Sequence, residues 1–221
     1  MKLSNYLQLY FIAGAENCHN NQSIEQVVSG ALRGGATLFQ FREKGDTALG
    51  DQEKLQCAMR LKVLCRAYSV PLIINDDAEL MVACGADGLH IGQDDGDIAE
   101  IRSLIGNEKI LGVSVHSLNE AVTAVKAGAD YLGIGPIYPT SSKRDAKSVL
   151  GTGVVEQIRK RFTSVPIVGV GGIRAENAKK VIAAGADGVG VISAISGSCS
   201  PYTAASNLWK EVTDACAAYK S

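Results

Sequence analysis

Three side chains that can bind an anion lie close together near residue 40. Gln40, Arg42 and Lys44 stand at alternating positions, so in an extended strand they share one face. A guanidinium group beside an ammonium group suits a phosphate or a diphosphate, because together they supply directed hydrogen bonds and charge. The alternative is a solvated strand end with ordinary surface ion pairs. We expect an anion-binding site here.

Carboxylates follow two apolar runs further along the chain. Asn75 and Asp76 come directly after one run, and Asp95 comes shortly after the next. Mg²⁺ is typically held by one or two carboxylates, with water and phosphate oxygens completing its octahedron. Asp and Asn are also common N-caps, so helix capping explains either cluster equally well when it is taken alone. If the two runs are adjacent parallel strands, the carboxylates meet at one rim, and the pattern predicts a Mg²⁺ site.

A hydroxyl and an imidazole come next in the chain. Ser114 stands near the end of an apolar run and can contact a ligand oxygen, and His116 follows two residues later. His116 can serve as a general base near neutral pH or as a hydrogen-bonded group at the start of a helix. With no Cys/His nucleophile arrangement beside it, the sequence leaves the role of His116 open.

Two further segments are suited to a phosphate group. Residues 136–150 form a connection that is long for a compact domain, and its hydroxyls and Lys143 can close over an anionic substrate. A disordered loop is the alternative. The glycines of segment 169–173, and the residues from Ile192 and Ser193 onward, stand where backbone N–H groups near a helix start commonly bind phosphate in barrel proteins.

These residues need a regular framework to position them, and short β-branched runs that alternate with stretches of helical period provide one. We expect eight strands, at Leu7–Ile12, Thr37–Arg42, Pro71–Asn75, Gly88–Gly92, Ile110–Val115, Tyr131–Gly135, Pro166–Gly169 and Gly188–Ile192. A helical stretch follows each strand. The sequence has no GxGxxG motif, which is typical of a doubly wound sheet. We therefore predict an α/β protein with a single (β/α)8 TIM-barrel domain over residues 1–221, whose active site lies at the carboxyl ends of the strands.

A repeated pattern supports the barrel. The order Gly-Ala-Asp occurs three times where a helix should end and a strand should begin. Glycine suits the left-handed residue that ends a helix. Asp87, Asp130 and Asp187 then begin strands at the end of the barrel away from the catalytic rim. We expect these three aspartates to have a structural role.

Composition limits the partners. Lys plus Arg number 22 and Asp plus Glu number 23, and aromatic residues make up 5% of the chain, so neither a basic field nor stacking side chains favour nucleic acid or an anionic membrane. No apolar run reaches the roughly 20 residues of a membrane helix, and we assign residues 1–15 to the first strand rather than to a signal peptide. Six cysteines without a CxxC pair indicate reduced thiols in the cytoplasm. The expected partners are small molecules, and a homo-oligomer is compatible with the sequence.

Six short motifs occur in one order along residues 7–196: Gln-x-Arg-Glu-Lys, Ile-Asn-Asp, His-x-Gly-Gln-x-Asp, Gly-x-Ser-x-His, Gly-Pro-x-x-Pro-Thr and Gly-Gly-Ile. In this order they resemble the thiamine phosphate synthase family. The resemblance implies a transferase that joins hydroxymethylpyrimidine diphosphate to hydroxyethylthiazole phosphate and releases diphosphate, with Mg²⁺ as its only cofactor. It also implies that diphosphate leaves first and that the thiazole nitrogen captures a pyrimidine-stabilised carbocation, so no protein nucleophile is required.

The resemblance implies a role for each candidate residue. Asn75 would contact the pyrimidine, and Asp76 and Asp95 would bind Mg²⁺. The residues that bind the diphosphate would be Gln40, Arg42, Lys44, Ser114 and Lys143, and all of these except Gln40 would assist the chemistry. The residues that bind the thiazole phosphate would be Thr140, Ser142, Gly172, Ile192 and Ser193.

Two positions depart from the pattern of that family. Asp77 stands where an arginine is common, and Ser142 stands where a threonine is common. The second change is conservative. The first places a negative charge beside a proposed metal ligand, which changes affinity there unless Asp77 is simply a helix cap.

Two other functions stay open at this point. One is a thiazole tautomerase-like isomerase on the same barrel, which would keep the phosphate site and lack the diphosphate and metal groups. The other is a non-catalytic protein that binds a phosphorylated metabolite, which would bind thiamine phosphate and make none. Pro136 and the segment 140–143, together with Arg42 and both aspartates, resemble the synthase rather than the isomerase.

Overall fold

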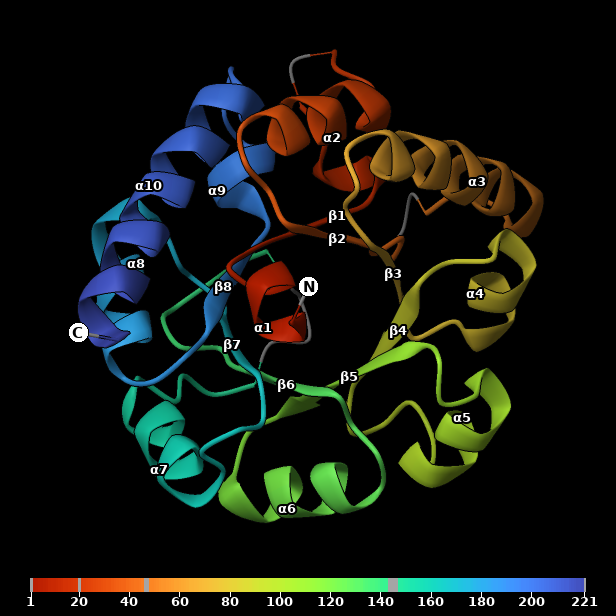
Figure 1. Ribbon diagram of the computed structural model, residues 1–221. Helices are drawn as coiled ribbons and strands as arrows, with labels where there is room; N and C mark the ends of the chain where they lie inside the picture. Colours follow the sequence, from red (N-terminus) through yellow and green to blue (C-terminus); the bar gives the residue numbers. More distant parts are fainter. Residues whose placement is uncertain (1, 20, 46–47, 143–146, 221) are drawn as a thin grey trace.

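Eight parallel strands close into a barrel in the computed structural model, which describes residues 2–19, 21–45, 48–142 and 147–220. The strands are ordered as in the chain, and the ring closes because β8 pairs with β1 (Figure 1). They are β1 (Leu9–Ala13), β2 (Leu38–Phe41), β3 (Leu72–Asn75), β4 (Gly88–Ile91), β5 (Ile110–Val115), β6 (Tyr131–Ile134), β7 (Ile167–Val170) and β8 (Gly188–Val191). The predicted TIM-barrel fold is confirmed.

Helices alternate with the strands and surround the barrel, except for α1, which lies at the middle of the ring, and for α9 and α10, which both follow β8 (Figure 1). They are α1 (Leu3–Tyr6), α2 (Ile24–Arg33), α3 (Asp51–Ala67), α4 (Ala78–Cys84), α5 (Ile98–Ile105), α6 (Leu118–Lys126), α7 (Gly153–Arg161), α8 (Ala175–Ala183), α9 (Ser193–Ser196) and α10 (Pro201–Lys220), with a 3-10 helix at Ala15–Asn17. Ser23 caps α2 in a capping box with Gln26, and Ser117 caps α6. Both caps satisfy backbone N–H groups that a helix start leaves without partners.

Alternation along the strands produces two apolar layers. In β1, Leu9 and Phe11 join a cluster between the strands and the outer helices, whereas Tyr10 and Ile12 join a smaller cluster inside the barrel. Successive strand residues point to opposite faces, so every second side chain points into the barrel. A polar residue at such a position near a carboxyl end therefore lies beneath any cavity at that end.

The assignment of residues 1–15 to the first strand is wrong in part. Residues 3–6 form α1, and β1 begins two residues later than predicted, at Leu9. Leu3, Tyr6 and Leu7 have the spacing of one helical face, and all three pack in or against the cluster inside the barrel. In Figure 1 α1 lies in the middle of the ring of strands, where it closes one end of the barrel.

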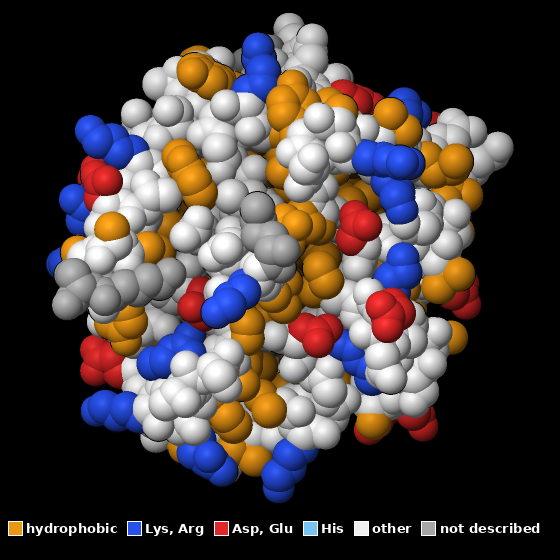
Figure 2. Space-filling model, in the orientation of Figure 1, with side chains coloured by type: hydrophobic (Ala, Val, Ile, Leu, Met, Phe, Trp, Pro, Cys, Tyr) orange, Lys and Arg blue, Asp and Glu red, His pale blue; other side chains and the backbone are white. Residues whose placement is uncertain are grey.

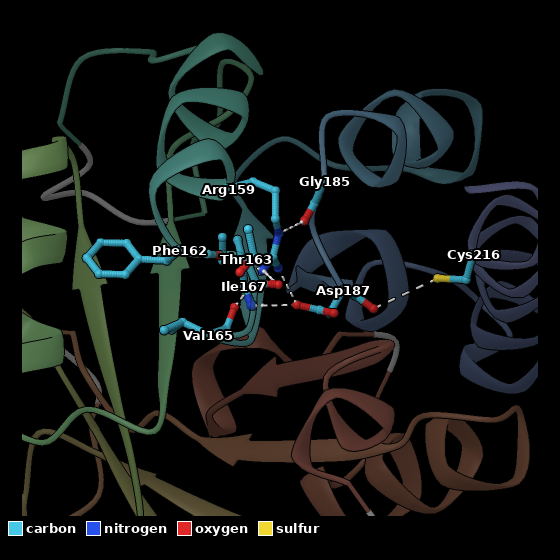
Figure 3. A network of polar contacts seen from close by, with 8 residues as sticks. All are labelled: Arg159, Phe162, Thr163, Val165, Ile167, Gly185, Asp187 and Cys216. Carbon is cyan, nitrogen blue, oxygen red and sulfur yellow. Dashed lines mark hydrogen bonds and ion pairs between the residues drawn. The ribbon is translucent and has the colours of Figure 1, made fainter. Parts of the chain in front are cut away.

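The aspartates that begin strands join neighbouring strands to each other. Asp187 Oδ2 accepts hydrogen bonds from Ile167 N (2.8 Å) and from Arg159 Nη2 (2.6 Å). Arg159 also donates to the carbonyl oxygens of Gly185 and Val165 (Figure 3). One guanidinium group and one carboxylate thus hold the end of α7, the end of α8 and the start of β7 together.

The whole arrangement recurs at Asp130, and its hydrogen bond from a strand N–H recurs at Asp87. Asp130 Oδ2 accepts from Leu111 N (2.7 Å) and from Arg102 Nη2 (2.5 Å). Asp87 Oδ2 accepts from Leu72 N (2.8 Å). In each case a carboxylate satisfies a strand N–H at the end of the barrel that α1 closes. The predicted structural role of the three aspartates is confirmed.

Asp187→Asn is expected to lower the free energy of unfolding by about 2 kcal/mol, because it removes a charge-assisted hydrogen bond from a largely buried guanidinium group. Urea unfolding followed by circular dichroism measures the change. The matched control is Glu211→Gln, which breaks the pair of Glu211 with the exposed Lys179 and should cost less than about 1 kcal/mol. Equal costs for the two variants would contradict the assignment.

The face of the molecule in Figure 2 carries basic and acidic side chains interspersed with apolar ones, so charges of one sign do not gather in one patch on that face.

None of the described helices has both the length and the apolar character that a membrane crossing requires. All six cysteines carry free thiols, and four of them are buried.

Candidate active site

One cavity of about 770 Å³ opens at the carboxyl ends of the strands. It lies at the end of the barrel opposite to α1. Twelve of the thirteen residues predicted from the sequence line it: Gln40, Arg42, Lys44, Asn75, Asp76, Asp95, Ser114, Thr140, Ser142, Gly172, Ile192 and Ser193. The thirteenth, Lys143, lies outside the described residues.

The three predicted anion donors share one wall of the cavity. Gln40 lies in β2, and Arg42 and Lys44 follow it; Gln40 and Arg42 are buried, and Lys44 is half-exposed. Glu43 points to the other side, where it accepts hydrogen bonds from Ala15 N (2.8 Å) and Leu49 N (3.2 Å). The predicted alternation therefore continues past the end of β2 and turns two cations toward the cavity.

Asp76 and Asp95 follow the adjacent strands β3 and β4 and interact directly with each other. Burial raises the pKa of Asp76, Lys44 opposes this rise, and the neighbouring Asp95 adds to it. Burial acts in the same direction on Asp95, but hydrogen bonds from Asp76 and from the N–H of Gly92 outweigh it and lower the pKa. Two carboxyl groups this close favour a shared proton or a bound cation, because their like charges repel.

The carboxyl pair fits Mg²⁺. Asp76 Oδ2 is buried and forms an ion pair with Lys44, and the Asp95 carboxyl group lies beside it. The two side chains therefore offer carboxylate oxygens, which are the ligands that Mg²⁺ takes in proteins. No group of three or more His, Cys, Asp or Glu side chains surrounds one point in the described parts of the chain, so a cation here would take its other ligands from water or substrate. Mg²⁺ is usually bound in that way.

Asp77 is a helix cap in this structure. Its Oδ1 accepts from Leu80 N (2.8 Å) at the start of α4, and its Oδ2 pairs with Lys54 Nζ of α3 (2.7 Å). Burial opposes ionisation of Asp77, but these two partners outweigh it and lower its pKa. The side chain is absent from the cavity lining, so the departure from the family pattern places its charge toward α3 rather than toward Asp76.

The opposite wall of the cavity is made of hydroxyls and backbone. Ser142 Oγ donates to Ser193 Oγ (3.0 Å), which joins the loop after β6 to the start of α9. Gly172 has φ +65°, and a Cβ there would meet the carbonyl oxygen of Pro139 at 2.5 Å. Only glycine therefore lets the loop after β7 approach the loop after β6 this closely.

His116 is hydrogen-bonded at the start of α6. Its backbone N–H donates to Glu120 Oε2 (2.7 Å), and its Nδ1 lies 3.0 Å from the same oxygen. This is the structural alternative that the sequence left open, although the ring also lines the cavity.

Three residues of the cavity floor were missed by the sequence analysis. Tyr10 and His90 line the cavity, and Tyr131 lies directly behind them; all three are buried. They connect Gln40 to Ser114 through hydrogen bonds. The available signal was position, since each is a polar residue at an inward-facing position of a strand. His90 also opens the motif His-x-Gly-Gln-x-Asp, in which Asp95 was the residue given a role.

Comparisons with known proteins point to one family. A family model described as thiamine monophosphate synthase matches residues 9–195. The chain is 54% identical to the thiamine-phosphate synthase of Geobacillus kaustophilus, over 93% of this chain and 92% of that protein. It is 50% identical to that of Bacillus cereus strain B4264, over 96% and 95%. The solved structure of a thiamine phosphate pyrophosphorylase from Pyrococcus furiosus superimposes with a TM-score of 0.86 at 35% identity, covering 96% of this chain and 98% of that one. The chain therefore belongs to the thiamine monophosphate synthase family.

Proposed function

We propose that this protein is a Mg²⁺-dependent transferase that joins hydroxymethylpyrimidine diphosphate to hydroxyethylthiazole phosphate, forming thiamine phosphate and diphosphate. The observation that carries the proposal is one cavity in which cations and a carboxyl pair line one wall, and hydroxyls and glycine backbone line the other. Two anionic substrates can bind there side by side. The whole chain, residues 1–221, acts as a single barrel domain with its active site at the carboxyl ends of the strands.

The cationic wall would bind the leaving group. The Arg42 guanidinium can donate two parallel hydrogen bonds to phosphate oxygens, and Lys44 adds a point charge. Gln40 and Ser114 would add neutral donors, and Lys143 would complete the group from the loop after β6. Charge that builds up on the departing diphosphate is then stabilised by groups that are already in place.

The reaction we propose begins with breakage of the bond between the pyrimidine methylene carbon and the diphosphate oxygen. The electron pair leaves with diphosphate, and the carbocation is stabilised by the pyrimidine ring, which Asn75 would hold. The thiazole nitrogen then donates its lone pair to the methylene carbon and forms the new C–N bond. Thr140, Ser142, Gly172, Ile192 and Ser193 would hold the thiazole phosphate in place for that attack.

Asp76 and Asp95 would hold Mg²⁺, which when bound neutralises negative charge on the diphosphate. No protein nucleophile is needed, and the residues of the cavity fit this: they are cations, carboxylates and hydrogen-bond donors whose contribution is to bind, orient and neutralise. We also propose a cytoplasmic location, which the free thiols support.

Turnover tests the proposal directly. Purified protein supplied with both phosphorylated substrates and Mg²⁺ should release thiamine phosphate and diphosphate in equal amounts. An isomer of the thiazole phosphate that forms when the pyrimidine diphosphate is left out would support the isomerase instead. Binding of thiamine phosphate without any turnover at micromolar protein would indicate the non-catalytic alternative.

A further inference from the structure

Five polar side chains from five strands form a continuous chain of hydrogen bonds beneath the cavity. Gln40 Nε2 donates to Tyr10 Oη (2.6 Å), and Tyr10 Oη lies 2.9 Å from Tyr131 Oη. Tyr131 Oη lies 2.9 Å from His90 Nδ1, and His90 Nε2 lies 2.9 Å from Ser114 Oγ. We call this set the Gln40–Ser114 chain. Its two ends belong to the proposed diphosphate site.

Neighbouring residues make room for this chain. Tyr10 and Tyr131 are 1% and 0% exposed. A Cβ at Gly112 would overlap the Tyr131 ring, and a Cβ at Gly133 would lie 3.0 Å from His90 Cε1. Glycine at these two strand positions therefore leaves the space that the Tyr131 and His90 rings occupy.

One direction of hydrogen-bond donation satisfies every link of this chain. The Gln40 amide nitrogen can only donate, so Tyr10 accepts, and every link is satisfied when Tyr10 donates its single hydrogen to Tyr131. Tyr131 then donates its own hydrogen bond to His90 Nδ1. A neutral imidazole that accepts at Nδ1 carries its proton on Nε2, so His90 Nε2 donates to Ser114 Oγ.

Both tyrosines keep their single proton near neutral pH. Burial is the largest influence on each, and it raises the pKa of Tyr10 and of Tyr131 above the ordinary value. The Ser114 hydroxyl, which accepts from His90, has its own proton left for a group in the cavity.

We propose that the Gln40–Ser114 chain fixes His90 as its Nε2-protonated tautomer and so makes Ser114 a hydrogen-bond donor toward an anionic oxygen in the cavity. The inference deepens the proposed function and rests on it for the identity of the anion, a diphosphate. Tyr10, Tyr131 and His90 are then positioning residues that act through Ser114. The same direction prevents His90 from accepting the Ser114 proton, so the Ser114–His90 contact does not activate a nucleophile.

The tautomer can be observed in the unmodified protein. Histidine labelled with ¹⁵N is examined by two-dimensional ¹H–¹⁵N spectroscopy at neutral pH, with inorganic diphosphate and Mg²⁺ present, and His90→Gln assigns the signal. We expect the His90 proton on Nε2, with Nδ1 unprotonated. A proton on Nδ1, or on both nitrogens, would overturn the proposal.

A double-mutant cycle tests whether Tyr131 acts through Ser114. Tyr131→Phe keeps the ring and removes the hydroxyl, and it should weaken binding of inorganic diphosphate with Mg²⁺ about tenfold, as Ser114→Ala should, since each loses the value of about one hydrogen bond to a charged group. The double variant should bind no more weakly than Ser114→Ala alone. Losses that add in the double variant would show an independent structural effect and would contradict the proposal.

The matched control is Tyr6→Phe, which removes a hydroxyl from a ring that packs against the same inner cluster from the other end of the barrel. It should leave diphosphate binding unchanged. Neither experiment needs turnover, so failure to make thiamine phosphate would reject the proposed function while the tautomer and the cycle still decide this inference.

Discussion

Turnover is expected to stop when EDTA removes divalent cations and to return when Mg²⁺ is added in excess. The reason is that Asp76 and Asp95 place two carboxyl groups beside the proposed site of the diphosphate, where a departing anion without a cation would meet repulsion rather than stabilisation. A coupled assay for released diphosphate measures the rate. Unchanged turnover after exhaustive chelation would contradict Mg²⁺ dependence.

The variant Asp76→Asn tests where the cation binds. Asp76 has φ +61°, and asparagine tolerates this conformation as aspartate does, so the variant removes charge without a new backbone demand. It should raise the Mg²⁺ concentration needed for half-maximal rate by about tenfold or more, by analogy with the loss of one charge-assisted interaction. Asp77→Asn is the control: Asp77 faces Lys54, so the Mg²⁺ requirement should not change. Equal shifts in both variants would place the cation elsewhere.

Arg42→Met is expected to lower kcat/KM for the pyrimidine diphosphate by about 100- to 1,000-fold, the usual cost of removing one donor that stabilises charge in the transition state. Arg42 is 6% exposed, so its charge acts with little screening by water. Arg42→Lys should recover part of the loss, because it restores charge but not the two-pronged hydrogen bond.

The control for Arg42 is Arg60→Met, which removes an exposed guanidinium group that pairs with Glu25 on the outside of the barrel. Its kinetic constants should match those of the unmodified protein. An Arg42→Met variant that loses affinity for the thiazole phosphate and keeps its affinity for the pyrimidine diphosphate would contradict the assignment of Arg42 to the diphosphate site.

The framework was predictable because the barrel repeats one local rule. β-branched runs bounded by glycine, and caps such as Ser23 and Ser117, specify where strands and helices begin. Parallel strands then bring their carboxyl ends to one rim, so residues that follow strands are placed near one another without knowledge of any long-range contact. Arg42, Asp76 and Ser114 were found in this way.

Features that depend on packing were not predictable from the same rule. α1 forms because Leu3 and Tyr6 find an apolar cluster inside the barrel, which a local pattern does not reveal. The assignment of Asp77 depended on Lys54 in a different helix. Tyr131 was missed because its partners, Tyr10 and His90, come from strands far away in the chain.

A crystal structure of the protein with Mg²⁺, inorganic diphosphate and the thiazole phosphate tests the central claim most directly. We expect Mg²⁺ in contact with Asp76 and Asp95, diphosphate oxygens on Arg42 and Lys44, and the thiazole phosphate against Gly172 and Ser193. Diphosphate bound at the glycine-rich wall, with no cation between the two aspartates, would contradict it.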